Sequence, residues 1–178
     1  MAKHIPNILT LLNMALGLIA ILLLMQPEHP HKVSIVVGLV FFGGIIDFLD
    51  GFLARKLNTA SNLGKQLDSF ADIITFGVAP IMLINYISHC QPTILLIASS
   101  LVFMLAGAYR LARFNLNDFS KHFVGLPITA AGITLVVFGI AYKLWLINLP
   151  IAACIIITNA VIITLSVMMI SKRKFRRV

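Results

Sequence analysis

The sequence has 178 residues, of which 60% are hydrophobic and 11% are charged, and its mean hydropathy is +1.00. This apolar content exceeds what the core of a water-soluble domain of this length requires, so we expect an integral membrane protein. The net charge is +8, but the basic residues flank apolar segments and do not gather on one face of a soluble fold. That distribution argues against a nucleic-acid-binding protein.

Six apolar runs are long enough to cross a bilayer, which takes about 20 helical residues each. The expected helices lie at residues 8–25, 33–54, 66–88, 93–114, 127–147 and 150–170. The first run has no small-residue cleavage site after it, so we expect a retained helix and not a secretory signal. We therefore predict an all-α integral membrane fold of six transmembrane helices, with residues 1–178 forming a single domain.

The basic residues predict the orientation of these helices. Of the 14 Lys and Arg residues, all except Lys32 and Lys143 fall on one predicted side. Short loops rich in Lys and Arg remain in the cytoplasm. Both termini and the acidic segment are therefore expected on the cytoplasmic side of the cell (inner or plasma) membrane.

Four of the six acidic residues fall within one stretch, at Asp47, Asp50, Asp68 and Asp72. An Asp at the centre of a membrane helix costs roughly 2.5–3.5 kcal/mol on insertion scales, so four of them demand a positive partner. The members of each pair are three or four residues apart and share a helix face. A polar turn at residues 56–62, with Ser61 or Asn62 as a helix cap, would let two antiparallel helices bring the pairs together.

A carboxylate cluster suits hard divalent cations, and two Mg²⁺ ions would balance four Asp. Arg55 offers a planar guanidinium for phosphate oxygens, while Gly51, Ala54 and Gly64 leave the backbone open to a substrate. Together these features suggest phosphoryl-group transfer on a lipid. Two alternatives stay open: the small residues could serve only helix packing, and intramembrane Asp residues could mark a divalent-cation carrier or channel.

The pattern Asp47-x-x-Asp50-Gly51-x-x-Ala54-Arg55, then eight residues, then Gly64-x-x-x-Asp68-x-x-x-Asp72, resembles the signature of the CDP-alcohol phosphotransferase family at every fixed position. The resemblance implies six transmembrane helices, commonly in a homodimer. It also implies displacement of CMP from a CDP-linked lipid or alcohol by another hydroxyl, with divalent metal required. Mg²⁺ or Mn²⁺, two ions in each site, are the expected cofactors.

The resemblance also implies roles for individual residues. Asp47, Asp50 and Asp68 would be metal ligands, and Asp72 would contact metal and act as general base. The remaining residues expected to bind the CDP-lipid are Asn7, Thr10, Gly51, Ala54, Arg55, Gly64 and Lys65.

Further stretches resemble the phosphatidylserine synthases of the bacterial and archaeal membrane type. They are IPNILTLLNMALGLIAI near the start, LDSFADIITFGVAP at 67–80, YRLARFN at 109–115 and FVGLP at 123–127. One departure is Thr129, where many such proteins have Pro. The expected substrates are CDP-diacylglycerol and L-serine, with CMP and phosphatidylserine as products in the surrounding membrane lipid.

Arg110 and Arg113 are three residues apart and are expected to bind the serine carboxylate. The same two side chains would suit the phosphate of glycerol 3-phosphate or inositol phosphate, so a different acceptor alcohol stays open.

Overall fold

The computed structural model describes residues 4–57, 59, 61–88, 93–116, 123–146, 149–171 and 174–175. Six helical spans within these residues are long and apolar enough to cross a membrane. Their elements are α1 (Ile5–Met25), α2 (Lys32–Lys56), α3 (Asn62–Asp72), η2 (Ile73–Val78), α4 (Ala79–Ile87), α5 (Ile94–Leu116), α6 (Ile128–Ala141), η3 (Tyr142–Leu146) and α7 (Ile151–Ile170). The prediction of six membrane-length helices is confirmed.

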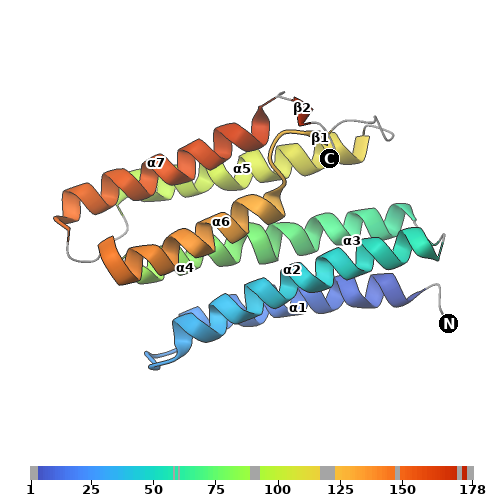
Figure 1. Ribbon diagram of the computed structural model, residues 1–178, viewed down its shortest axis with the longest axis horizontal. Coiled ribbons are helices and arrows are strands. Elements are labelled where there is room, and N and C mark those ends of the chain that lie inside the picture. Colours follow the sequence, from blue (N-terminus) through green and yellow to red (C-terminus); the bar gives the residue numbers. More distant parts are fainter. Residues whose placement is uncertain are drawn as a thin grey trace.

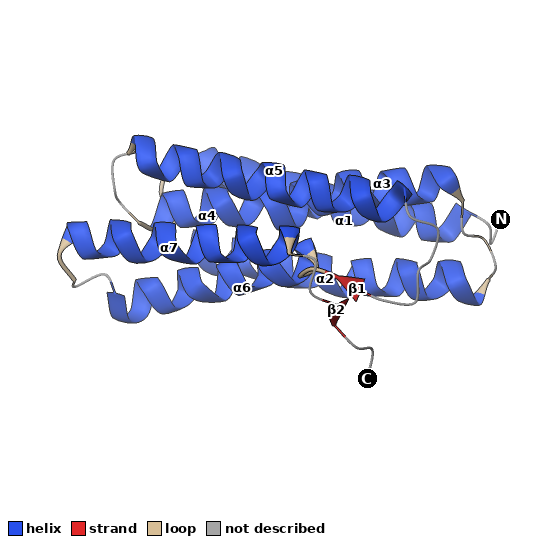
Figure 2. Ribbon diagram, turned by 90° about the horizontal axis from the view of Figure 1, so that it is seen from above, coloured by secondary structure: helices blue, strands red, loops and turns tan. Residues whose placement is uncertain are grey.

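The helices form an elongated bundle in which successive spans run in opposite directions (Figure 1). α1 and α2 pack along each other as a hairpin, and α5 packs along α7. The third span, made of α3, η2 and α4, contacts α1 on one side and α6 on the other. Figure 2 shows the same bundle from above, with α1 beginning at the end of the molecule where α3 also begins.

The third span is continuous from Asn62 to Ile87 but changes its hydrogen bonding at Ile73, where η2 forms a π-helical segment. π-helical turns are uncommon and often occur at functional sites. Here η2 directly follows Asp72, the last residue of α3. Within η2, the Thr75 hydroxyl donates to the Asn13 carbonyl of α1 at 3.0 Å, which ties the central span to α1.

Glycines let neighbouring helices approach η2 closely. A side chain at Gly132 of α6 would overlap the carbonyl oxygen and Cα of Phe76. A side chain at Gly17 of α1 would meet Thr75 in the same way. Close backbone approach at small residues is a general means of packing helices in membranes.

The helix bounds differ modestly from those expected. The first helix begins at Ile5 and the third at Asn62, each a few residues before its expected start, because Pro6 and Ser61 provide good helix beginnings. The Ser61 hydroxyl accepts from the Gly64 amide at 3.0 Å, which confirms one of the two predicted caps. The expected polar turn is described only in part.

A short feature that the all-α prediction did not include joins the segment before α6 to the end of the chain. β1 (Phe123–Val124) pairs antiparallel with β2 (Lys174–Phe175). The next residue, Gly125, has φ of +81°, and a side chain there would strike the Met169 carbonyl of α7. The segment that leads into α6 is thereby held against the end of α7.

The close contact at Gly132 gives a stability prediction. Gly132→Ala places a methyl group against the Phe76 backbone, so we expect a loss of about 1–3 kcal/mol, the usual cost of overpacking. The measurement is thermal unfolding of purified protein in detergent, followed by the fluorescence of Trp145. Gly38→Ala is the matched control, because a Cβ at Gly38 meets no atom within 4 Å. An unfolding temperature for Gly132→Ala equal to that of Gly38→Ala would contradict this account of the packing.

Candidate active site

Three carboxylates from two helices meet near one end of the bundle. Asp47 and Asp50 lie on the C-terminal part of α2, and Asp68 lies on α3. One carboxylate oxygen from each residue lies within 4.8 Å of those from the other two. The spacing of three residues on α2 puts Asp47 and Asp50 on one face, and the antiparallel turn brings Asp68 opposite them.

Asp72 lies one helical turn beyond Asp68 and deeper in the bundle, with 7% of its surface exposed. Its carboxylate interacts with those of Asp47 and Asp68 and with the guanidinium of Arg110. One of its oxygens, Oδ1, is buried without a hydrogen-bond partner among the described residues. A buried carboxylate oxygen left unpaired is costly, so this atom is suited to a ligand or a proton.

Helix α1 contributes a hydroxyl to the cluster. Thr10 Oγ1 lies 2.7 Å from Asp50 Oδ2 and 3.0 Å from the Pro6 carbonyl oxygen. A hydroxyl has one proton to donate, so it can serve only one of these acceptors at a time. Its contact with Asp50 connects α1 to α2 at the carboxylates, where both residues are buried.

A cavity of about 130 Å³ opens beside Asp50 and Asp68 between α1, α2 and α3. Six of the seven residues predicted to bind the CDP-lipid line this cavity: Asn7, Thr10, Gly51, Ala54, Gly64 and Lys65. A Cβ at Gly64 would lie 3.1 Å from Asn7 Oδ1 and 3.2 Å from Ser61 Oγ, so a larger residue would crowd this wall.

The seventh of these residues, Arg55, is exposed and is not among the residues lining the cavity. Its Nη1 atom would lie 3.9 Å from a Cβ placed on Gly51. Arg55 therefore lies beside the Gly51 wall, outside the cavity.

The two arginines of α5 have different surroundings. Arg110 is 7% exposed, and its guanidinium interacts electrostatically with Asp72. Arg113 is less buried, and its Nη1 atom donates to the Ile170 carbonyl at the end of α7 at 3.4 Å. The structure thus brings Arg110 to the carboxylates and directs Arg113 towards α7, although their spacing predicted one shared role.

Three further polar residues adjoin the cluster and were not predicted as site residues. The Thr129 hydroxyl, in the first turn of α6, interacts with the Asp47 carboxylate. The Asn115 amide of α5 donates to Ser69 Oγ at 2.9 Å, and Ser69 is the neighbour of Asp68. The position of Asn115 close to Arg110 and Arg113 was a weak sequence signal for a role in the site. Thr129 stood out in the sequence only because many similar proteins have Pro at that position.

The donor set of the cluster fits a hard divalent cation. All of the close ligand atoms are carboxylate oxygens, the type that Mg²⁺ and Mn²⁺ prefer. Asp72 adds a fourth carboxylate with an unpaired oxygen. Among the described residues, Arg110 is the basic group that interacts with Asp72, so most of the negative charge lacks a counter-charge from the protein itself.

Comparison with known proteins agrees with this geometry. Residues 3–170 match the CDP-alcohol phosphatidyltransferase family. The chain belongs to this family. Members of the family generally use divalent metals, and the six apolar spans identify this member as a multi-pass membrane protein.

Several curated members of the family are similar over most of this chain. The chain is 38% identical to a CDP-diacylglycerol--serine O-phosphatidyltransferase of Bacillus subtilis, over 97% of this chain and 90% of that protein. It is 40% identical to the protein of that name from Methanocaldococcus jannaschii, over 81% of this chain and 64% of the relative. It is 36% identical to an archaetidylserine synthase of Methanothermobacter thermautotrophicus, over 74% of this chain and 55% of the relative.

The carboxylate cluster gives a prediction about metal binding. Asp68→Asn removes one anionic ligand, so we expect the dissociation constant for Mn²⁺ to rise at least about tenfold, since even partners of metal ligands contribute this much. Electron paramagnetic resonance of free Mn²⁺ in titrations of the purified protein measures it. Glu28→Gln, which removes an acidic group from the connection between α1 and α2 at the opposite end of the bundle, is the control and should bind Mn²⁺ like the unaltered protein. Equal affinities for all three proteins would contradict a metal site at Asp68.

Proposed function

We propose that this protein transfers the phosphatidyl group of CDP-diacylglycerol to the hydroxyl of L-serine, which gives phosphatidylserine and CMP. The observation that carries the proposal is a carboxylate cluster adjoining a polar, small-residue cavity on one side and a buried arginine on the other. The relatives that act on these substrates by name support the choice of serine.

The four carboxylates would have two roles, which are metal binding and proton transfer. Asp47, Asp50, Asp68 and Asp72 would hold two divalent ions, Mg²⁺ or Mn²⁺, which when bound supply positive charge for the diphosphate oxygens. Asp72 is also the proposed general base. It would take the proton from the serine hydroxyl as the serine oxygen bonds to the lipid-side phosphorus and the bond from that phosphorus to CMP breaks.

The cavity beside Asp50 would bind the diphosphate end of the CDP group. Its volume of about 130 Å³ is small compared with the roughly 300–1,000 Å³ of ordinary ligand pockets. The remainder of the nucleotide would therefore extend across the mouth of the cavity, where the exposed Arg55 can reach it. Asn7 and Lys65 offer further hydrogen-bond donors from the cavity wall.

Arg110 is the residue best placed to bind the serine carboxylate. Its guanidinium already interacts electrostatically with Asp72, so a carboxylate bound by Arg110 would bring the serine hydroxyl near the proposed base. An acceptor that carries a phosphate, such as glycerol 3-phosphate, would use the same guanidinium and is the alternative for this site.

The proposal includes an orientation and an assembly. Arg55, Lys56 and Lys65 lie at the carboxylate end, whereas Lys32 and Lys143 lie at the other end. This asymmetry supports a carboxylate end that faces the cytoplasm, where serine and CMP exchange with solution. A homodimer is the assembly expected from the sequence resemblance.

The decisive assay is release of CMP by the purified protein in detergent with CDP-diacylglycerol and Mg²⁺. L-serine, glycerol 3-phosphate, inositol phosphate and no acceptor are compared, and a chelator removes the metal. We expect serine-dependent release that the chelator abolishes.

Asp72→Asn is the matched inactive variant, because it keeps the size of the side chain but cannot accept the proton. It should release less than about one hundredth as much CMP, the usual lower contribution of a general base. Release that is strongest with another acceptor would reject serine, and no release with any acceptor would favour the cation carrier. Substantial turnover by Asp72→Asn would reject this residue as the base.

The different surroundings of Arg110 and Arg113 predict that their substitution changes the KM for serine to different extents. Arg110→Gln should raise the KM for serine at least about tenfold, the effect of losing one charge-assisted contact with the carboxylate. Arg113→Gln should change it less, because the Arg113 guanidinium contacts the end of α7. Initial rates over a range of serine concentrations test both variants. A larger KM for Arg113→Gln than for Arg110→Gln would reverse the assignment.

A further inference from the structure

A second cavity, of about 490 Å³, lies at the end of the bundle opposite to the carboxylates. We call it the distal cavity, and its lining residues are Glu28, His29, Pro30, Val33, Tyr86, Ile87 and Lys143. Val33 precedes Asp47 by fourteen residues on α2, which is about 21 Å at 1.5 Å per residue. The distal cavity is therefore separate from the proposed active site, and its volume is in the range of ordinary ligand pockets.

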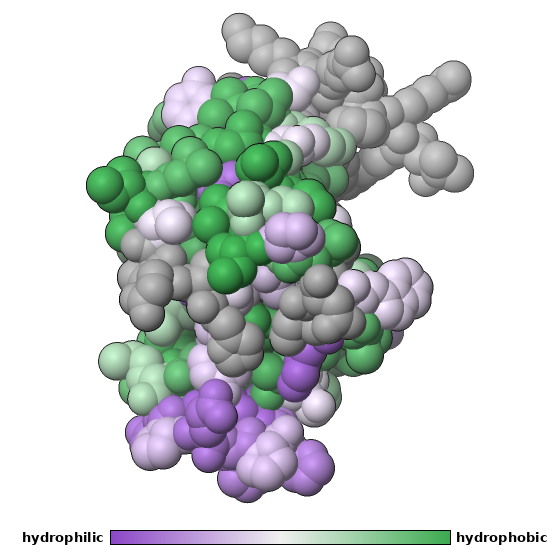
Figure 3. All heavy atoms as spheres, turned by 90° about the vertical axis from the view of Figure 1, so that its left-hand side faces the viewer, coloured by the Kyte–Doolittle hydropathy of each residue, from purple (hydrophilic) through white to green (hydrophobic). Residues whose placement is uncertain are grey.

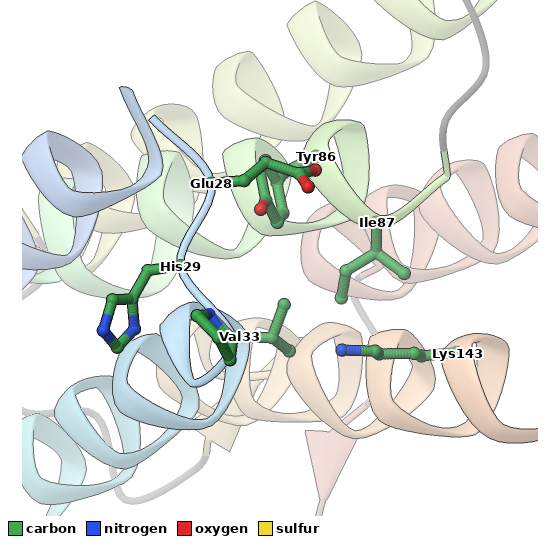
Figure 4. Close-up of a pocket in the computed structure, with 7 residues that line it drawn as sticks. Glu28, His29, Val33, Tyr86, Ile87 and Lys143 are labelled. Carbon is green, nitrogen blue, oxygen red and sulfur yellow. The ribbon is translucent and has the colours of Figure 1, made fainter. Parts of the chain in front are cut away.

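Charges of both signs line the distal cavity. Glu28 comes from the connection between α1 and α2, and Lys143 comes from η3. Figure 4 shows Glu28 and Tyr86 on one side of the opening, with the Lys143 ammonium reaching towards Val33 on the other. This arrangement is complementary to a molecule that carries one negative and one positive group.

A buried lysine lies against Tyr86, one of the lining residues, but does not itself line the distal cavity. Lys32 is 4% exposed, donates to the Gln26 carbonyl, and holds its ammonium 4.7 Å from the centre of the Tyr86 ring. Within the described parts of the chain, neither Lys32 nor Lys143 has a carboxylate oxygen within 4.0 Å. Of the two, Lys143 lines the distal cavity, and its ammonium without such a partner favours an anion there.

The surroundings of the distal cavity place it at the level of lipid headgroups. Trp145, two residues after Lys143, is 78% exposed, and its neighbour Leu144 is exposed as well. Exposed Trp residues in membrane proteins gather at the boundary between headgroups and acyl chains. Figure 3 views this end and shows hydrophilic residues gathered at one side with hydrophobic residues beside them. A lipid could thus place its headgroup in the cavity and its chains against the apolar flank.

We propose that the distal cavity binds the headgroup of a phospholipid that carries a phosphate and a primary ammonium, from the leaflet at this end. Lys143 contacts the phosphate and Glu28 accepts from the ammonium. A quaternary ammonium would need an open aromatic face, and the Tyr86 ring already has the Lys32 ammonium against it. The proposal is independent of the transferase reaction, because it concerns residues at the opposite end of the bundle.

Trp145 is the single Trp of the sequence and serves as the probe. Delipidated protein in detergent micelles is titrated with phosphatidylethanolamine whose acyl chains carry bromine, which quenches Trp fluorescence. Brominated phosphatidylglycerol, which has the phosphate but no ammonium, is titrated in parallel. We expect saturable quenching by phosphatidylethanolamine at a mole fraction about tenfold lower than that needed by phosphatidylglycerol, because one charge-assisted contact distinguishes them.

Variants at the two charges test each contact. Lys143→Gln should raise the half-quenching mole fraction of both lipids about tenfold, and Glu28→Gln should bring phosphatidylethanolamine to the level of phosphatidylglycerol. Lys56→Gln, which removes an exposed charge at the other end of α2, is the control and should leave both titrations unchanged. Each variant is first compared with the unaltered protein for its thermal unfolding temperature.

Three results would overturn the proposal. Identical quenching of the unaltered protein and Lys143→Gln would show that the lipids only surround Trp145 as solvent. Equal affinity for the two lipids would remove the role of Glu28. Quenching of Glu28→Gln by phosphatidylethanolamine at the same mole fraction as for the unaltered protein would show that this carboxylate does not bind the ammonium.

Discussion

The cost of placing carboxylates in an apolar bundle is the constraint on which the rest of this structure depends. Asp47, Asp50 and Asp68 have oxygens within 4.8 Å of one another, and Asp72 is buried beside them. Like charges at such distances in a medium of low polarity repel strongly, so the arrangement requires added positive charge. Arg110 interacts electrostatically with the deepest of the four, Asp72, which leaves the remaining charge for divalent cations.

Close helix packing is what allows the carboxylates to meet. Gly17 and Gly132 let α1 and α6 contact the backbone of η2, the segment that directly follows Asp72. The same approach brings Thr10 of α1 to Asp50 and Thr129 of α6 to Asp47. Gly17 and Gly132 thus contribute to the site indirectly, because tight packing at η2 positions the polar groups around the cluster.

The local features of the site were predictable, whereas those that depend on long-range packing were not. The i, i+3 and i, i+4 spacings place each Asp pair on one face, and the Ser61 cap marks where α3 begins. Thr129 is distant in sequence and reaches Asp47 only because α6 packs on η2. Arg110 and Arg113 are about 60° apart around α5, so their separate surroundings depend on how α5 sits between α3 and α7.

The length of α2 explains how this chain places polar groups in both headgroup layers. It also explains how a lipid can reach the carboxylates. Its 25 residues extend about 37 Å, longer than the roughly 30 Å hydrocarbon layer. Lys32 at its beginning and Lys56 at its end therefore reach opposite boundaries. Asp50 lies six residues before Lys56, about 9 Å along the axis. A lipid diphosphate can reach this depth while its acyl chains stay in the bilayer, and a small acceptor needs to descend only a short distance from solution.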